Sequence, residues 1–146
     1  MIKKLTIPVD HGNRNMKTTH FLFTTGLSAT DRKPAGREDF LQTEGKYYVL
    51  SGKRIPYQRD KTQDERFSIL TRFAIAKELE RTGQVAEEDV VQVSLPIGVP
   101  PKHYAELADR YREYFLGDGK VQELVYNGRT YHTCIRDVAV YPPAYA

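Results

Sequence analysis

The stretch Val9-Asp10-His11-Gly12-Asn13-Arg14-Asn15-Met16-Lys17 is the part of the sequence that most constrains the fold and the chemistry. Glycine and asparagine tolerate unusual backbone angles, so a tight turn over residues 11–15 can direct several N–H groups at an anion. Asp10, at the end of a first strand, would hold a hydrated magnesium ion, which takes few carboxylates. Lys17 would return on the next strand as a point charge for phosphate. The stretch predicts a phosphate-binding loop, although an ordinary surface hairpin with one acid and one lysine fits the same pattern taken alone.

Strands are expected on both sides of this turn, over residues 4–10 and 16–25. Pro8 argues for an edge or a bulge in the first of them, because proline removes a donor from the ladder. Residues 28–38 are rich in Ser, Thr, Asp, Pro and Gly and predict a loop. Residues 40–50 then predict a hairpin around Glu44-Gly45.

A helix is the clearest element of the central region. Thr62 and Glu65 have the spacing of a capping box, and Gly83 is placed to end the helix. The residues between them give a wide apolar face, made of Phe67, Ile69, Leu70, Phe73, Ala74, Ala76 and Leu79. A face of this width predicts that the helix packs against a sheet.

The remaining elements are strands and one more helix. In chain order the sequence predicts a buried parallel strand over residues 90–95, a helix opened by Pro100-Pro101 and closed by Gly117, a hairpin of residues 121–126 and 129–134 around Asn127-Gly128, and a last strand over 135–141. A mixed sheet covered by helices satisfies this order, so we expect an α/β fold of the ribonuclease H-like class. Residues 1–146 are expected to form a single subdomain. Because the chain stops directly after a strand, that subdomain is expected to be a piece of a longer protein.

The composition excludes several classes of protein. With 40% apolar and 28% charged residues, the 146-residue chain fits one soluble domain. No apolar run approaches the roughly 18 residues of a membrane helix, and no signal-peptide pattern precedes the first strand. The single cysteine, Cys134, is expected to be a small buried hydrophobe and suits a reducing cytosol. The net charge of +3 comes without a long Lys/Arg block, so no direct binding to nucleic acid is expected.

Two further groups of polar residues favour ordinary surface roles. The densest basic stretch contains Lys53, Arg54, Arg59 and Lys61, and it predicts a solvated loop more than a contact surface for a partner subunit. The four histidines show no close pairing of the kind that holds a metal ion. Of these, only His11 sits where it could face a phosphate.

A longer set of segments is similar to one protein family. Residues 8–18 resemble the first phosphate-binding loop of the ParM/StbA-type actin-like ATPases of plasmid segregation. Other matching segments follow in the family's order: Thr25-Gly26-Leu27, Gly45-Lys46-Tyr47-Tyr48-Val49, Asp60-Lys61-Thr62, Asp64-Glu65, Val93-Ser94-Leu95-Pro96-Ile97-Gly98 and Val138-Ala139-Val140-Tyr141-Pro142. The resemblance covers essentially the whole chain, and the ordered set is far more specific than any one motif.

The resemblance implies both a function and a set of site residues. It implies the N-terminal subdomain of a bacterial, cytoplasmic ATPase that uses ATP or GTP with Mg²⁺, polymerises into filaments and separates plasmids through a DNA-binding adaptor. Asp10 matches the family's magnesium-linked acid and is the candidate catalytic residue. Gly12, Asn13 and Asn15 match the phosphate-cradling turn, and Lys17 matches the phosphate-contacting lysine. The second phosphate loop and the nucleoside pocket would lie beyond residue 146, so the isolated chain is expected to be inactive.

One departure from the family leaves two alternatives open. Where related sequences have Pro-Gln after the last strand, this chain has Pro142-Pro143, which removes the side chain that orients the attacking water. A non-catalytic interaction or scaffold domain of the same fold is therefore the first alternative. A ribonuclease H-like nuclease, which also has an acid on its first strand, ranks lower, because several carboxylates must converge on its two metal ions and Ser94-Leu95-Pro96-Ile97 offers none.

Overall fold

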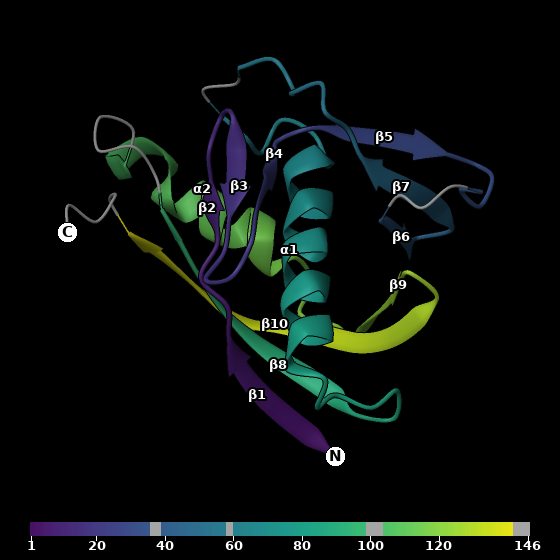
Figure 1. Ribbon diagram of the computed structural model, residues 1–146. Coiled ribbons are helices and arrows are strands. Elements are labelled where there is room, and N and C mark those ends of the chain that lie inside the picture. The colour runs from purple at the N-terminus through teal and green to yellow at the C-terminus, as the bar shows by residue number, and fades with distance from the viewer. Residues whose placement is uncertain (36–38, 58–59, 99–103, 142–146) are drawn as a thin grey trace.

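Three parallel strands form the centre of the fold: β1 (Ile2–Thr6), β8 (Val90–Gly98) and β10 (Arg129–Tyr141), with β8 in the middle (Figure 1). The structure, a computed structural model, describes residues 1–35, 39–57, 60–98 and 104–141. Side chains alternate along β8, and one face of it is buried through Val91, Val93, Leu95 and Ile97. The predicted parallel strand at residues 90–95 is confirmed and extends to Gly98.

Pro8 lies where β1 passes into β2 (Asp10–His11), at the edge of the central sheet. The N–H of Ile7 donates to the carbonyl of Ser94 at 2.9 Å, and the N–H of Val9 donates to that of Pro96 at 3.0 Å. The chain therefore runs on beside β8 past the proline. Because alternate residues bond to β8, the nitrogen of Pro8 faces the outer edge, where its missing N–H breaks no ladder bond.

The predicted second strand over residues 16–25 is wrong, because two strands occupy it. These are β3 (Asn15–Lys17) and β4 (Leu22–Thr24), paired antiparallel, and the chain reverses between them where the N–H of Thr18 donates to the carbonyl of Phe21 at 2.9 Å. With β2 as the continuation of β1, the strands read β4-β3-β2/β1-β8-β10 across the molecule. This mixed order is the expected ribonuclease H-like arrangement.

Four more strands extend the sheet beyond β10, in the order β9 (Gln122–Tyr126), β6 (Phe40–Thr43), β7 (Lys46–Leu50) and β5 (Leu27–Thr30). The two predicted hairpin turns are confirmed. Glu44 and Gly45 have φ of 52° and 79°, and Asn127 and Gly128 have φ of 50° and 84°, the positive angles of a type I′ turn.

Two boundaries in this part of the chain differ from the prediction. β5 overlaps the start of the predicted loop of residues 28–38, because it pairs with β7 through its backbone while Ser28 and Ala29 stay exposed. The strands expected at 129–134 and 135–141 are one strand, β10, whose register against β8 shifts between Ile135 and Asp137. Local composition gives no signal for either feature.

Within the described residues, the helices are α1 (Arg66–Thr82) and α2 (Tyr104–Leu116). Gly83 and Gly117 follow them with φ of 63° and 62°, which confirms both predicted ends. The predicted capping box is wrong, because Glu65 makes no side-chain capping bond and the hydroxyl of Thr62 donates to Asp60 at 2.6 Å. The carboxylate of Asp64 instead accepts the N–H of Arg66 at 2.9 Å. Pro100 and Pro101 lie outside the described residues.

Both helices pack on the buried face of the sheet and against each other. The hydroxyl of Tyr114 on α2 donates to the carbonyl of Asp64 at 2.5 Å and accepts the N–H of Ser68 on α1 at 3.0 Å. The largest fully buried side chains of this core are Tyr126, Tyr131, Phe67, Phe73, Met16, Leu41, Ile69, Leu70, Ile75, Leu79, Leu95 and Leu124. The predicted α/β fold with helices covering a mixed sheet is confirmed.

Two charged residues near the end of α1 are buried and hold neighbouring segments. The amine of Lys77 lies 2.8 Å from Asp39 and 3.1 Å from the hydroxyl of Tyr126. Glu78 accepts the hydroxyl of Thr18 at 2.6 Å and the backbone N–H of His20 at 3.0 Å, and its other oxygen lies 2.7 Å from Nδ1 of the His20 ring. The reversal between β3 and β4 is therefore fixed by α1, which explains why sequence pattern alone predicted one strand there.

Glu78 makes stability depend on pH. Burial alone would raise the pKa of its carboxyl, but the hydrogen bonds from Thr18 and His20 lower it below the usual value. A lowered folded-state pKa means that the contribution to stability is fully present above the unfolded-state pKa of about 4.3 and is lost as the pH falls through the folded-state value. We expect Glu78→Gln to flatten the acid part of the stability profile measured by urea unfolding, whereas the exposed Glu88→Gln leaves it unchanged. Equal slopes in the wild type and Glu78→Gln would contradict this.

Two predictions about single residues are corrected. Cys134 is half-buried on β10. Lys61, expected in a solvated loop, is buried at 7% exposure. Within the described residues, no helix is long and apolar enough to cross a membrane.

Candidate functional site

The predicted phosphate loop lies at the carboxyl end of the parallel strands. Val9 forms a parallel bridge with Ile97 near the end of β8, and the end of β10 pairs beside it, Val140 with Ile97. Asp10 follows directly. In open α/β sheets, ligands bind outside the carboxyl ends of the strands. The fold therefore places the loop at the edge where a ligand site is expected.

Asp10 and Lys17 are direct partners across the β2–β3 hairpin. Directly paired residues of antiparallel strands project on the same face, with Cβ atoms about 4.5–5.5 Å apart. Both side chains are exposed, whereas the neighbouring pair, His11 and Met16, is buried at 4% and 0% exposure. The acid and the lysine thus share the outer face of the hairpin, and its inner face belongs to the core.

His11 anchors the inner face and does not face a phosphate. Its Nε2 lies 2.6 Å from the hydroxyl of Thr71, whose own hydrogen goes to the carbonyl of Phe67 at 2.7 Å, so Nε2 carries the proton and donates. The ring packs on Phe115, with 4.5 Å between ring centroids. Burial, with the nearby charge of Lys61, lowers the pKa of His11 to about 3. The ring is therefore neutral at physiological pH.

Three carbonyl oxygens of the loop are bound from within the protein. The amine of Lys61 donates to the carbonyl of His11, and the buried Thr25 donates its hydroxyl to the carbonyl of Gly12 at 2.8 Å and its N–H to that of Arg14 at 2.9 Å. In a planar trans peptide, the N–H of the next residue points opposite to the carbonyl. The N–H groups of Gly12 and Asn13 therefore point away from these anchors, which favours an anion over a cation at the loop.

Gly12 is required by a close backbone approach. A Cβ at this position would lie 2.4 Å from the carbonyl oxygen of Asn15, although the φ angle of Gly12 is not positive. The turn can be this tight only without a side chain.

A second glycine, Gly26, allows a close backbone contact beside the loop. A Cβ on Gly26 would lie 2.3 Å from the carbonyl oxygen of Ser51 and 2.4 Å from that of Lys53, and the N–H of Ile55 donates to the carbonyl of Thr25 at 2.7 Å. Residues 51–55 therefore pack directly on the segment that anchors the loop.

Lys61 is the residue of this site that the sequence analysis missed. Burial lowers the pKa of its amine, and the charge of Asp10 acts in the opposite direction. Its membership in the Asp60-Lys61-Thr62 segment of the resemblance was the available signal, but its neighbouring basic residues favoured a solvated loop. Arg59, Pro142 and Pro143 lie outside the described residues.

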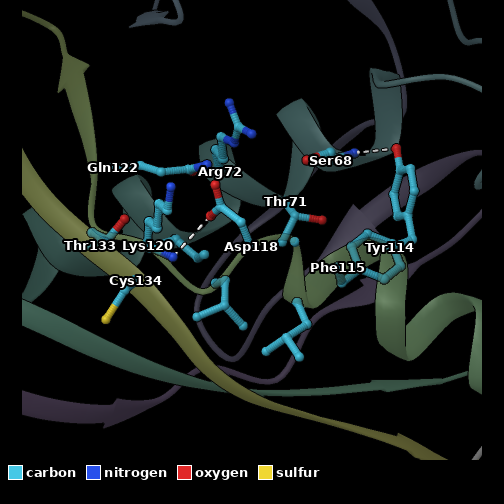
Figure 2. A pocket seen from close by; sticks show the side chains of 14 residues that line it. Ser68, Thr71, Arg72, Tyr114, Phe115, Asp118, Lys120, Gln122, Thr133 and Cys134 are labelled. Carbon is cyan, nitrogen blue, oxygen red and sulfur yellow. Dashed lines mark hydrogen bonds between the residues drawn. The ribbon is translucent and has the colours of Figure 1, made fainter.

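A partly enclosed cavity lies away from this loop. A space of about 50 Å³ lies between α1, the end of α2 and β10, with Arg72, Asp118, Thr133 and Cys134 around it (Figure 2). Small-molecule sites measure about 300–1,000 Å³ and a water molecule needs about 30 Å³, so this cavity has room for water only. Within the described residues, no three His, Cys, Asp or Glu side chains are grouped to hold a metal ion.

A match over almost the whole chain decides the family. Residues 8–145 match the family described as the N-terminal domain of actin-like proteins. The chain belongs to this family. The hairpin that carries Asp10 and Lys17 is thus the first hairpin of an actin-like N-terminal domain.

Solved structures share the fold of this actin-like domain. They include the apo psk41 ParM protein (TM-score 0.72, 14% identity, 96% of this chain and 50% of that one), an AlfA filament bound to AMPPNP (0.71, 15%, 95% and 54%) and Ta0583, an archaeal actin homologue (0.67, 15%, 94% and 45%). The chain spans about half the length of each. At these identities the likeness shows the fold alone. Among curated proteins, none matches the sequence significantly.

Proposed function

We propose that the chain is the N-terminal half of a filament-forming, actin-like ATPase of plasmid segregation, and that it supplies the first phosphate-binding loop. The observation that carries the proposal is the loop's polarity. Three of its carbonyls are bound from inside, while Asp10 and Lys17 share its outer face. This arrangement favours an anion that binds together with a cation.

We assign some residues of the loop to the phosphates and one, Asp10, to the metal ion. The N–H groups of Gly12 and Asn13 donate to the terminal phosphates, with Asn15 beside them, and Lys17 adds a point charge. Asp10 would hold hydrated Mg²⁺, which suits an ion that binds proteins through one or two carboxylates. The bound ion supplies charge neutralisation of the phosphate oxygens. The nucleotide is ATP, with GTP as the alternative.

The filaments formed by relatives support a proposal for assembly. AlfA and Alp12 are described as filaments, and AlfA binds AMPPNP there. We propose self-association of the full-length protein in the bacterial cytoplasm, with a DNA-binding adaptor linking the filament to its cargo. Co-sedimentation of the full-length protein with and without ATP tests the first part. Absence of pelletable polymer under both conditions would count against it.

The isolated chain is expected to bind ATP with a Kd of millimolar or weaker and to show no turnover. One wall of the site offers a few charge-assisted hydrogen bonds of about 1.5–3 kcal/mol each, whereas association costs about 4–15 kcal/mol. The two amounts nearly cancel. Isothermal titration of residues 1–146 with ATP and Mg²⁺ measures this, and micromolar affinity would show that the second half is not needed for binding.

A non-catalytic scaffold is the second candidate, and Pro143 favours it. Proline has no side-chain donor or acceptor to orient an attacking water. Full-length protein that neither binds nucleotide nor polymerises in its presence would support the scaffold over the ATPase. Binding without hydrolysis would retain the phosphate site and remove only the catalytic step.

A further inference from the structure

Lys61 is buried in a position where lysine is rarely found. Its side chain is 7% exposed, its amine donates to the carbonyl of His11, and it lies 5.5 Å from the centre of the Phe67 ring. Lysine is almost never fully buried unless it is paired, because removing its charge from water costs free energy. Its hydrogen-bond acceptor here is a backbone carbonyl of the proposed phosphate loop, and the charge that offsets its burial is that of Asp10.

The backbone around Lys61 is held on α2. The hydroxyl of Tyr111 accepts the N–H of Lys61 at 3.2 Å, and Asp60 forms an ion pair with Arg110. Asp60 also accepts the N–H of Thr62 at 2.9 Å. The start of the side chain is therefore fixed on one helix, and its amine is fixed on the loop.

Lys77 provides the comparison within the same chain. It is buried to a similar degree, at 9% exposure, but its amine pairs with the carboxylate of Asp39 at 2.8 Å and packs against the rings of Phe21 and Phe23. These contacts join α1 to Asp39, Phe21 and Phe23, none of which belongs to the proposed phosphate loop. The amine of Lys61 instead acts on the peptide that joins His11 to Gly12.

We propose that Lys61 is a positioning residue of the phosphate loop, which holds the His11 carbonyl inward and so keeps the N–H of Gly12 directed at the terminal phosphates of a nucleoside triphosphate. The inference rests on the function proposed above. Lys61 is not a phosphate ligand in this arrangement, because its amine is buried and already donates to the loop. Lys17, exposed on the outer face, is the lysine that reaches the phosphates.

The test compares two nucleotides in the full-length protein. ATP with Mg²⁺ uses the loop, whereas AMP lacks the terminal phosphates and depends on the nucleoside pocket. Lys61→Met is expected to weaken ATP binding about tenfold, the loss of one net hydrogen bond and its orienting effect, and to leave AMP binding unchanged. Lys77→Met, which removes an equally buried lysine, is expected to lower thermal stability without changing the ratio of the two affinities. Titration calorimetry gives the ATP affinity, and ligand-observed NMR gives that of AMP.

The outcomes separate the inference from the function on which it rests. A wild-type protein that binds no ATP would contradict the proposed function itself. A wild type that binds ATP, together with Lys61→Met that keeps the wild-type affinity ratio, would overturn only the role of Lys61. If Lys61→Met does not fold, Lys61→Gln, which keeps a shorter N–H donor, is measured in the same way with a smaller expected loss. Failure of both variants to fold would also overturn the inference, because Lys61 would then serve the fold and not the loop.

Discussion

Asp10→Ala in the full-length protein is expected to abolish the magnesium-dependent part of ATP binding. Asp10 is the exposed acid at the start of β2, opposite Lys17, and it is the residue we assign to the hydrated metal ion. Hydrogen bonds to charged groups are worth about 1.5–3 kcal/mol, so the affinity for ATP with Mg²⁺ should fall roughly 10- to 150-fold. Without Mg²⁺, the wild type and the variant should bind ATP alike.

Two control variants sharpen this experiment. Asp10→Asn keeps the size of the side chain and removes its charge, so it should behave like Asp10→Ala if the charge matters. Asp109→Ala removes an acid that is 93% exposed on α2 and should leave binding unchanged. If Asp10→Ala retains magnesium-dependent affinity for ATP, Asp10 is not part of the site. Comparing magnesium- or manganese-dependent nuclease activity of the wild type and Asp10→Asn tests the nuclease alternative in the same preparations.

Gly12→Ala is expected to damage both the stability of the domain and its binding of ATP. The new Cβ would lie 2.4 Å from the carbonyl oxygen of Asn15, so one strand of the hairpin must move. Overpacking of this kind costs about 1–3 kcal/mol. The movement would also shift the peptides that carry the N–H groups of Gly12 and Asn13, so ATP affinity should fall by about tenfold or more, the equivalent of one hydrogen bond.

Gly52→Ala is the matched control for this variant. A Cβ at Gly52 meets no atom within 4 Å, and its φ angle lies outside the left-handed region. We expect thermal unfolding and ATP titration of Gly52→Ala to match the wild type. A Gly12→Ala protein with wild-type stability and affinity would show that the hairpin accommodates the methyl group and that the tight turn is not needed for binding.

The elements that the sequence predicted well are those fixed by local chemistry. Asn127-Gly128 turns the chain because both residues accept positive φ, and Gly83 and Gly117 end the helices for the same reason. The phosphate loop was predicted because its glycine and asparagines, with an acid and a lysine, are close together in the sequence, and it stays a prediction. The structure adds that Asp10 and Lys17 project on the same face of the hairpin.

The features that the sequence did not predict depend on distant residues. The reversal between β3 and β4 is held by Glu78, which follows Thr18 by 60 positions. β5 exists because β7 lies beside it, and its exposed side chains carry no burial pattern. The sequence around Lys61 predicts a surface lysine, whereas in the fold its amine donates to the carbonyl of His11. Each of these contacts is long-range, so no local pattern could reveal it.

Helix α1 contacts three distant parts of the domain, through Thr71, Arg72 and Glu78. Thr71 binds the ring of His11, Arg72 donates to Thr43 at 3.1 Å in the β6 strand, and Glu78 holds the turn after β3. A rigid helix cannot shift at one of these attachments without pulling on the others. We therefore expect a shift of β6 to be transmitted through α1 to the hairpin that carries Asp10 and Lys17.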